Sequence, residues 1–222
     1  MSNKKAVVFG TGAFAEVVQF YLSHDSEYEV AGFTATSNAI SCEAMQGLPV
    51  VPYEQVESVF PPADYDMFIA VGYAKFNSVR ERFFRDAKSK GYSLLSYICS
   101  KATVWVDEIR MGENVFIFED NTVQPFVTIG DGVILWSGNH IGHHSKIGDF
   151  CFVSSHVVMS GHCDIGSYSF LGVNATIADG VKIGKRNLIG PGALMQKGSG
   201  DDEAWFAERA KKSPKGSGRF FQ

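Results

Sequence analysis

Histidine is scarce in this chain except in one short stretch. Five of the six histidines lie between Asn139 and Gly166, namely His140, His143, His144, His156 and His162. Imidazoles at this density could bind a metal ion, act as a general base, or simply face solvent. The sequence around them separates these alternatives, because the stretch belongs to a strict repeat.

The repeat is a run of large apolar residues at every sixth position. They are Trp105, Met111, Ile117, Val123, Ile129, Leu135, Ile141, Ile147, Val153, Met159, Ile165, Leu171, Ile177, Ile183, Ile189 and Met195. The residue two places before each is usually small, and the next residue is often glycine. A helix cannot sustain a period of six, so the pattern predicts a parallel β-helix with one strand and one corner per hexad. We expect the glycines to adopt backbone angles that other residues resist.

None of the five histidines falls on the axial or the small inward position, so none is predicted to be a core residue. Cys151 and Cys163 do occupy the small inward positions and are interpreted as packing residues. His144 and His162 are one coil apart, about 4.8 Å at the strand spacing of a sheet. A zinc site there would still need a third ligand, and we expect no metal.

The first hundred residues follow a different pattern. Strands are predicted within 5–12, 28–35, 48–56, 65–74 and 92–98, and helices over 13–25 and 75–91, the second ended by Gly91. Alternation of strand and helix predicts a parallel sheet with covering helices, an α/β Rossmann-like domain.

Hexads of the form [LIV]-G-x-x-[small]-x after such a domain resemble the bacterial nucleotide-sugar acyltransferases. That family includes sialic acid O-acetyltransferases and the N-acetyltransferases of UDP-4-amino sugars and GDP-perosamine. The resemblance extends to about Gln196 and includes "FLGVNATI" and "LIGPGAL". It implies a Rossmann-like nucleotide-sugar-binding domain at 1–100, a left-handed parallel β-helix of hexapeptide repeats at 101–198 and a C-terminal tail at 199–222. It also implies a homotrimer with coenzyme sites between neighbouring prisms.

The activity implied by this resemblance is acyl transfer from an acyl-CoA, acetyl-CoA first. The acceptor would be the amino group of a nucleotide-linked amino-deoxysugar used in bacterial surface glycan synthesis. Transfer to a sugar hydroxyl, transfer of a larger acyl group, and a non-catalytic β-helix binding protein are the alternatives.

The family's catalytic pattern is His-[Asp/Glu]-x-x-Ile-Gly-[Asp/Glu], and this chain reads "HHSKIGD" from His143. The resemblance implies that His143 is the base, and a neutral imidazole suits that role near pH 7. It extends the catalytic set to His144, Asn139 and Gly161, with the Gly161 N–H as oxyanion donor. His144 replaces the usual carboxylate, which leaves open whether His140, Asn139, His156 or Asp149 orients the base. The acyl-CoA site is expected to contain Trp136, Phe152, Gly161, His162, Ala178 and Pro191.

The stretch "FGTGAFAE" resembles the dinucleotide fingerprint G-x-G-x-x-G/A, a weak signal alone. It follows a predicted strand and opens a helix whose first amides could hold a phosphate. The second strand ends in "GFTATS", without the carboxylate that binds the ribose of NAD, so NAD is not expected. A turn without any ligand is the alternative. The resemblance implies a nucleotide-sugar site at Gly10, Thr11, Gly12, Ala13, Phe14, Phe33, Thr34, Gly72 and Tyr73.

Composition sets further bounds. A net charge of −4, with no basic cluster that has aromatic residues interleaved in it, argues against nucleic-acid binding, and no apolar run could span a membrane. Four cysteines without C-x-x-C spacing favour the cytoplasm. In the tail, residues 202–212 are predicted to form an amphipathic helix that packs Trp205 and Phe206 on a subunit. Lys211, Lys212 and Lys215 would either be solvated or contact coenzyme A phosphates.

Overall fold

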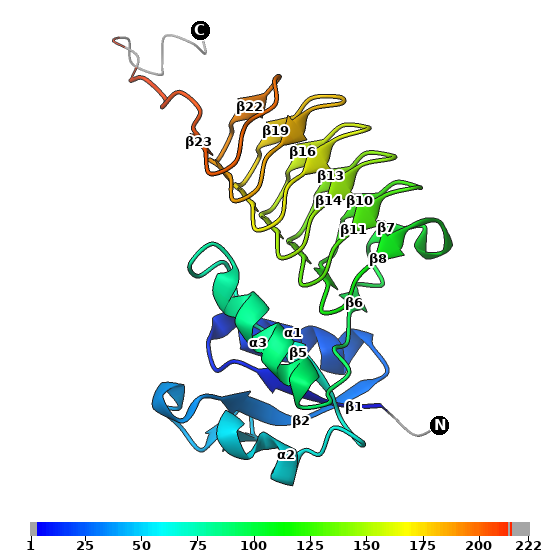
Figure 1. Ribbon diagram of the computed structural model, residues 1–222, viewed down its shortest axis with the longest axis vertical. Helices are drawn as coiled ribbons and strands as arrows, with labels where there is room; N and C mark the ends of the chain where they lie inside the picture. Colours follow the sequence, from blue (N-terminus) through cyan, green and yellow to red (C-terminus); the bar gives the residue numbers. More distant parts are fainter. Residues whose placement is uncertain (1–3, 213, 215–222) are drawn as a thin grey trace, which may run out of the picture.

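The protein consists of an N-terminal α/β domain joined to a long β-prism (Figure 1). The structure is a computed structural model and describes residues 4–212 and 214. The α/β domain lies beside the first coils of the prism, and the chain leaves the prism at the opposite end (Figure 1). No helix among the described residues is both long and apolar enough to cross a membrane.

The α/β domain is built on a five-stranded sheet in the order β3-β4-β2-β1-β5. Its strands are β1 Lys4–Phe9, β2 Tyr28–Ala35, β3 Ala44–Met45, β4 Leu48–Pro52 and β5 Asp66–Ile69, and only the β3–β4 pair is antiparallel. The helices are α1 Ala13–Asp25, α2 Val56–Val59 and α3 Ser78–Ser89, with short 3₁₀ turns η1 Ser37–Ala39 and η2 Tyr53–Gln55. Helix α1 buries Ala15, Val18 and Leu22, spaced by three and four residues, so that one apolar stripe faces the sheet.

Most predicted elements of this domain are confirmed, and α1 and β2 have the predicted bounds. Helix α3 begins later than predicted because Lys75, Phe76 and Asn77 all have positive φ angles, of 49°, 51° and 62°. The strand predicted over 92–98 is largely wrong. Leu94 makes an isolated bridge to Met67, and the end of the segment forms the first strand of the prism instead.

The prism has three faces of short parallel strands (Figure 1). The β13 face contains β7 Thr103–Val104, β10 Thr122–Val123, β13 His140–Ile141, β16 Val158–Met159, β19 Thr176–Ile177 and β22 Leu194–Met195. The β14 face contains β8 Arg110–Met111, β11 Thr128–Ile129, β14 Lys146–Ile147, β17 Asp164–Ile165 and β20 Lys182–Ile183. The β15 face contains β6 Tyr97–Ile98, β9 Phe116–Ile117, β12 Ile134–Leu135, β15 Phe152–Val153, β18 Phe170–Leu171, β21 Leu188–Ile189 and β23 Ala204–Trp205. This is the left-handed β-helix expected from the hexads.

The predicted axial residues form the core of the prism from Ile117 to Met195, each no more than 3% exposed. Strands pair in register with those of the next coil, as Thr122 does with His140 and His140 with Val158. Trp105 is an exception and is 62% exposed. Because Val104 takes its place beside Val123, the coil that contains the 3₁₀ turn η3 (Val106–Glu108) has one extra residue.

The repeat glycines were predicted to adopt unusual backbone angles, and this reason for their presence is wrong. The left-handed conformation falls two residues later in the hexad, mostly on residues with side chains, such as His144 (φ 59°) and His162 (φ 56°). The glycines are needed for close approach between coils. A Cβ on Gly142 would lie 2.5 Å from the carbonyl carbon of Ser160.

The inward cysteines pack as predicted. Cys151 and Cys163 are buried, and burial raises the pKa of the Cys151 thiol to about 12. In contrast, the tail helix is wrong, because Ala204–Trp205 forms strand β23 alongside β21. Trp205 and Phe206 remain 40% and 70% exposed on this chain. Lys211 and Lys212 are exposed, and Lys215 lies outside the described residues.

Candidate active site

Three of the clustered histidines meet at one corner of the prism. This histidine corner, residues 142–145, 160–163 and 178–181, joins the β13 face to the β14 face. His143 Nδ1 lies 3.1 Å from His144 Nδ1. The His162 ring lies 5.0 Å from the rings of both, and stacks on that of His144. All three side chains are exposed, and their ligating nitrogens lie within 4.8 Å of one another.

Gly161 leaves room above the His143 ring. The two residues occupy the same corner position in successive coils, and a Cβ on Gly161 would lie 3.0 Å from His143 Nε2 and 3.2 Å from Asp179 Oδ1. The Gly161 N–H has no acceptor within the described part of the chain. The corner therefore offers an accessible imidazole nitrogen beside a free backbone donor, the pair that acyl transfer requires.

The open question of what orients His143 has an answer in the geometry. His144, at the position of the carboxylate in the family pattern, is the partner of the His143 ring nitrogen Nδ1. The backbone is fixed as well, since the His143 N–H donates to Gln124 Oε1 at 2.9 Å and its carbonyl accepts from the His162 N–H at 2.9 Å.

The expected catalytic role of Asn139 is wrong. Asn139 is 1% exposed, and its amide is used inside another corner, donating to the Trp136 carbonyl and accepting from the Val157 N–H. Asp149 is similarly occupied, because its Oδ1 accepts from the Asp131 N–H. His156 belongs to that other corner too, and His140 lies on strand β13.

The glycine turn has the features of a phosphate-binding loop. Gly10 has φ 130°, and a Cβ there would lie 2.9 Å from the Ala70 carbonyl oxygen, so only glycine fits. Gly12 precedes α1 without a side-chain cap, and open space surrounds the position of its missing Cβ. Ala13, the first helical residue, is exposed, and Thr11 Oγ1 donates to the Ala39 carbonyl.

Two of the residues assigned to the nucleotide are buried in the core. Phe33 and Thr34 are both 0% exposed, and the Thr34 hydroxyl donates to the Val51 carbonyl, so their side chains cannot border a ligand. Phe14 is half-buried and packs 5.8 Å from the Trp136 ring. Sequence reasoning missed Glu54. This residue comes after β4 in the sequence, and its carboxylate accepts hydrogen bonds from the N–H and the hydroxyl of Ser37, which follows β2. It therefore brings a carboxylate close to the end of β2.

A second cluster forms at another corner of the prism. This tryptophan corner, residues 136–139, 154–157, 172–175 and 190–193, joins the β15 face to the β13 face. Tyr73 reaches it from the loop after β5 and packs edge-on against Phe152 at 5.1 Å. An apolar groove of about 250 Å³ results, lined by Tyr73, Trp136, Phe152, Ser154, Ser155 and Val173.

The residues expected to hold acyl-CoA are thus divided between two corners. Gly161, His162 and Ala178 lie with His143, whereas Trp136, Phe152 and Pro191 lie at or beside the tryptophan corner. The two corners are separated by the β13 face, a span of six residues or roughly 20 Å of extended chain. A single chain does not bring the two groups together.

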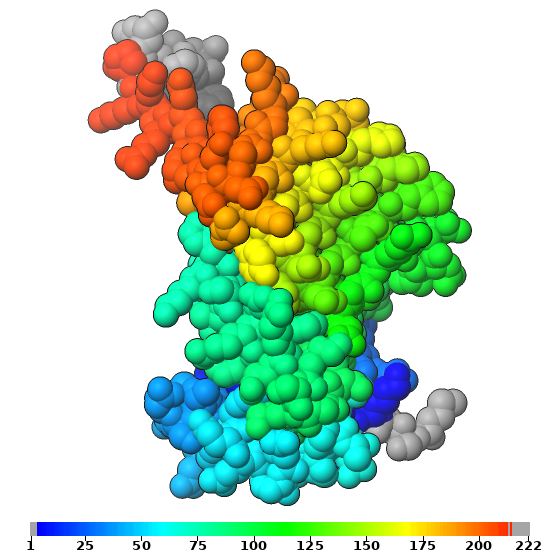
Figure 2. Space-filling model, in the orientation of Figure 1, coloured from blue at the N-terminus to red at the C-terminus, as the bar shows by residue number. Residues whose placement is uncertain are grey.

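Buried polar contacts fix the loop that carries Gly72 and Tyr73. Arg80 of α3 is 0% exposed and donates to the carbonyls of Val71 and Gly72, and also to Gly132, Phe150 and Cys151 of the prism. Burial lowers the pKa of its guanidinium to about 9, so it keeps its charge at neutral pH. Figure 2 shows the blue-green segment that contains α3 between the blue and cyan part of the α/β domain and the prism.

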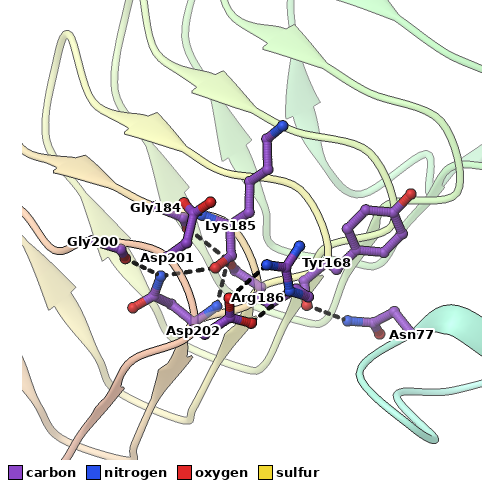
Figure 3. Close-up of polar contacts among 10 residues, drawn as sticks. Asn77, Tyr168, Gly184, Lys185, Arg186, Gly200, Asp201 and Asp202 are labelled. Atoms are coloured by element: carbon purple, nitrogen blue, oxygen red, sulfur yellow. Dashed lines mark hydrogen bonds and ion pairs between the residues drawn. The ribbon is translucent and has the colours of Figure 1, made fainter.

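A nearby contact holds the positive-φ turn that precedes α3. Asn77 Nδ2 donates to the Tyr168 carbonyl at 3.0 Å (Figure 3). The same view shows how the end of the prism is closed, with Arg186 forming a two-pronged ion pair with Asp202. The turn before α3 is therefore tied to the prism through Asn77.

Comparisons with known proteins agree with this arrangement. Residues 5–87 match the model of the PglD N-terminal domain, and residues 108–143 and 162–197 match the bacterial transferase hexapeptide (six repeats). A search of curated protein sequences finds no match.

Solved structures resemble the whole chain. PerB from Caulobacter crescentus, crystallised with CoA and GDP-perosamine, is 26% identical with a TM-score of 0.81, covering 90% of this chain and 92% of that one. The acetyltransferase domain of PglB from Neisseria gonorrhoeae FA1090, crystallised with acetyl coenzyme A, is 23% identical with a TM-score of 0.81 over 91% and 96%. WeeI from Acinetobacter baumannii AYE is 19% identical with a TM-score of 0.71 over 90% and 95%. The last two support the fold.

The two family models cover both domains in the order found here, and PerB extends the likeness across the junction between them. The chain therefore has a PglD-type N-terminal domain followed by bacterial transferase hexapeptide repeats, and it resembles PerB over both domains.

Proposed function

We propose that this acyltransferase moves an acetyl group from acetyl-CoA to the amino group of a nucleotide-linked amino-deoxysugar, for synthesis of a bacterial surface glycan. The observation that carries the proposal is the exposed His143, with Nδ1 partnered by His144 and Nε2 beside the free Gly161 N–H. PerB, crystallised with CoA and GDP-perosamine, supports both the coenzyme and the substrate class.

In the proposed mechanism His143 is the general base. In the tautomer whose Nδ1–H donates to His144, the Nε2 atom carries the lone pair. The amine attacks the thioester carbonyl and gives a proton to Nε2, while the Gly161 N–H stabilises the negative oxygen. Collapse forms the amide and expels the CoA thiolate, which takes the proton from the imidazolium.

The α/β domain is proposed to hold the nucleotide sugar. The Gly10–Ala13 turn would receive the diphosphate, because its glycines leave space in front of the α1 amides. Gly72 and Tyr73 would border the sugar at the tryptophan corner. Tighter binding of NADH than of any UDP-, TDP- or GDP-sugar in calorimetry would contradict this assignment.

The substrate is found most directly by a screen. UDP-, TDP- and GDP-linked 3-amino and 4-amino sugars are incubated with acetyl-CoA, and release of free thiol is followed. Hydroxyl sugars and longer acyl-CoAs test O-acylation and a larger acyl group. No thiol release with any pair would favour the non-catalytic alternative.

The base is tested with the substrate so identified. Because positioned base catalysis contributes about 10²–10⁴-fold, His143→Ala should lower kcat by that factor. His24→Ala is the control, because His24 is an exposed histidine on α1 and lies outside both corners of the prism. Near-normal activity of His143→Ala would refute the assignment.

A further inference from the structure

The histidine corner has the composition of a transition-metal site. His143, His144 and His162 form the only group of three or more potential metal ligands this close together in the described part of the chain. Imidazole nitrogen suits zinc, copper and nickel. The nearby Cys163 thiol is not available to a metal there, because it points inward toward the Ala178 carbonyl.

The distances are close to those of a bound ion. In a tetrahedral zinc site, Zn–N bonds of about 2.0–2.1 Å separate two ligating nitrogens by about 3.4 Å. The Nδ1 atoms of His143 and His144 are already 3.1 Å apart. His162 must approach by at most about 1.4 Å to complete the set, and its exposed ring is free to turn.

The coil geometry presets the ligands. His144 and His162 occupy equivalent left-handed positions one coil apart, and their rings stack at 5.0 Å. The His162 N–H donates to the His143 carbonyl, so the backbone carrying all three is tied together. Asp179 Oδ1, close to the missing Gly161 side chain, adds a negative charge at the same corner. Little ordering is needed to bind an ion, which favours affinity.

We infer that the histidine corner binds one zinc ion per chain through His143, His144 and His162, with water completing the coordination, and that the bound ion inhibits acyl transfer. The ion is not a cofactor, since coordination consumes the lone pairs that His143 and His144 need for proton transfer. The inhibition rests on the proposed role of His143, whereas the binding does not.

Binding is measured on the full chain with Co²⁺, a coloured substitute for zinc. Protein stripped with EDTA is titrated while visible absorption is followed, and Zn²⁺ is then added to displace the colour. We expect one tetrahedral site per chain, weakened at least tenfold by His162→Ala and unchanged by His156→Ala. Equal affinity in the wild type and His162→Ala, or no site at all, would overturn the inference.

Inhibition is a separate readout. With a competent substrate, stoichiometric Zn²⁺ should suppress the rate of the wild type and of His156→Ala, and EDTA should restore it. His162→Ala, compared with its own zinc-free rate, should resist the same concentration by at least tenfold. Zinc binding without inhibition would overturn the inferred inhibition and leave the inferred zinc site standing. If no substrate is ever found, the Co²⁺ titration still decides the first half.

Discussion

His143 is followed by His144, where the family pattern that this chain resembles has Asp or Glu, and this changes how the proposed base is held. A carboxylate beside Nδ1 fixes the tautomer by accepting a hydrogen bond and stabilises the imidazolium. His144 Nδ1 can accept the same hydrogen bond while it is neutral. It supplies no negative charge, however. In the proposed mechanism His144 is therefore a positioning residue.

Replacement of His144 tests this role. His144→Ala should lower kcat by about tenfold and leave KM nearly unchanged, because only the orientation of the base is lost. His144→Glu places a carboxylate beside Nδ1 and should recover most of the activity. Steady-state kinetics measure kcat and KM of both variants. Equal losses in the two variants would contradict a positioning role.

At the residue scale the sequence predicted which side chains face outward and which face inward. Hexad phase placed His143 and His144 on the outside of a corner and the two cysteines inside the prism, as found. Asn139 was misassigned, since an asparagine amide serves equally well in catalysis or in satisfying buried backbone groups inside a coil. Glu54 could not be found, because no local pattern shows that its carboxylate reaches Ser37 of another element.

Among the elements, period and composition predicted strands and helices wherever one pattern ran without interruption. The errors fall at its edges. The extra residue near η3 exposes Trp105. In the tail, Ala204–Trp205 pairs with the open edge of β21 as strand β23, although the pattern of its own sequence predicts a helix. The segment 92–98 was misread because it leaves one sheet and enters another, and local sequence carries no signal of that choice.

The close packing of neighbouring coils at Gly142 should contribute to the stability of the prism. Gly142→Ala would bring a Cβ within 2.6 Å of the Gly161 nitrogen, so two coils must separate beside the proposed oxyanion donor. We expect a loss of about 3 kcal/mol in the free energy of unfolding, the upper end for overpacking, together with a lower kcat. Gly72→Ala, where a Cβ meets open space, should be near neutral in denaturant unfolding. Similar stability of the two variants would contradict the close-packing role.

The contact between α1 and the first prism strand should depend on pH. Asp25 accepts from the Tyr97 hydroxyl at 2.5 Å and the Ser100 N–H at 2.8 Å. Burial alone would raise the pKa of Asp25, but the hydrogen bonds from Ser100 and Tyr97 outweigh it and lower the value to about 2, from 3.8. A depressed folded-state value means that this stabilisation is complete above about pH 4 and lost as the pH falls toward about 2.

Asp25→Ala should therefore reduce the free energy of unfolding by about 2 kcal/mol at pH 7, the usual cost of losing hydrogen bonds to a charged group. The difference from the wild type should shrink as the pH falls below about 4. Denaturant titrations at several pH values measure both quantities. A difference that stays constant down to pH 2 would contradict the linkage.

For the molecule as a whole, the β13 face is the surface best suited to a second copy. Its outward residues, including Val158 (43% exposed) and Leu194 (59% exposed), carry no acidic or lysine side chain, whereas Arg110, Lys146, Asp164 and Lys182 project from the β14 face. The β15 face is largely covered by the α/β domain. The β13 face also separates His143 from the Tyr73 groove. A neighbour packed on it would bring its own histidine corner to that groove.

We therefore expect a homotrimer whose sites each combine His143 of one chain with the Tyr73 groove of its neighbour. Light scattering should give about three times the chain mass of 24.3 kDa. His143→Ala and Tyr73→Ala chains, each nearly inactive alone, should complement when co-refolded. Under random mixing about a quarter of the sites pair an intact His143 with an intact groove, so about a quarter of wild-type activity should return. A monomer, or mixed trimers without recovered activity, would show that each chain builds its site alone.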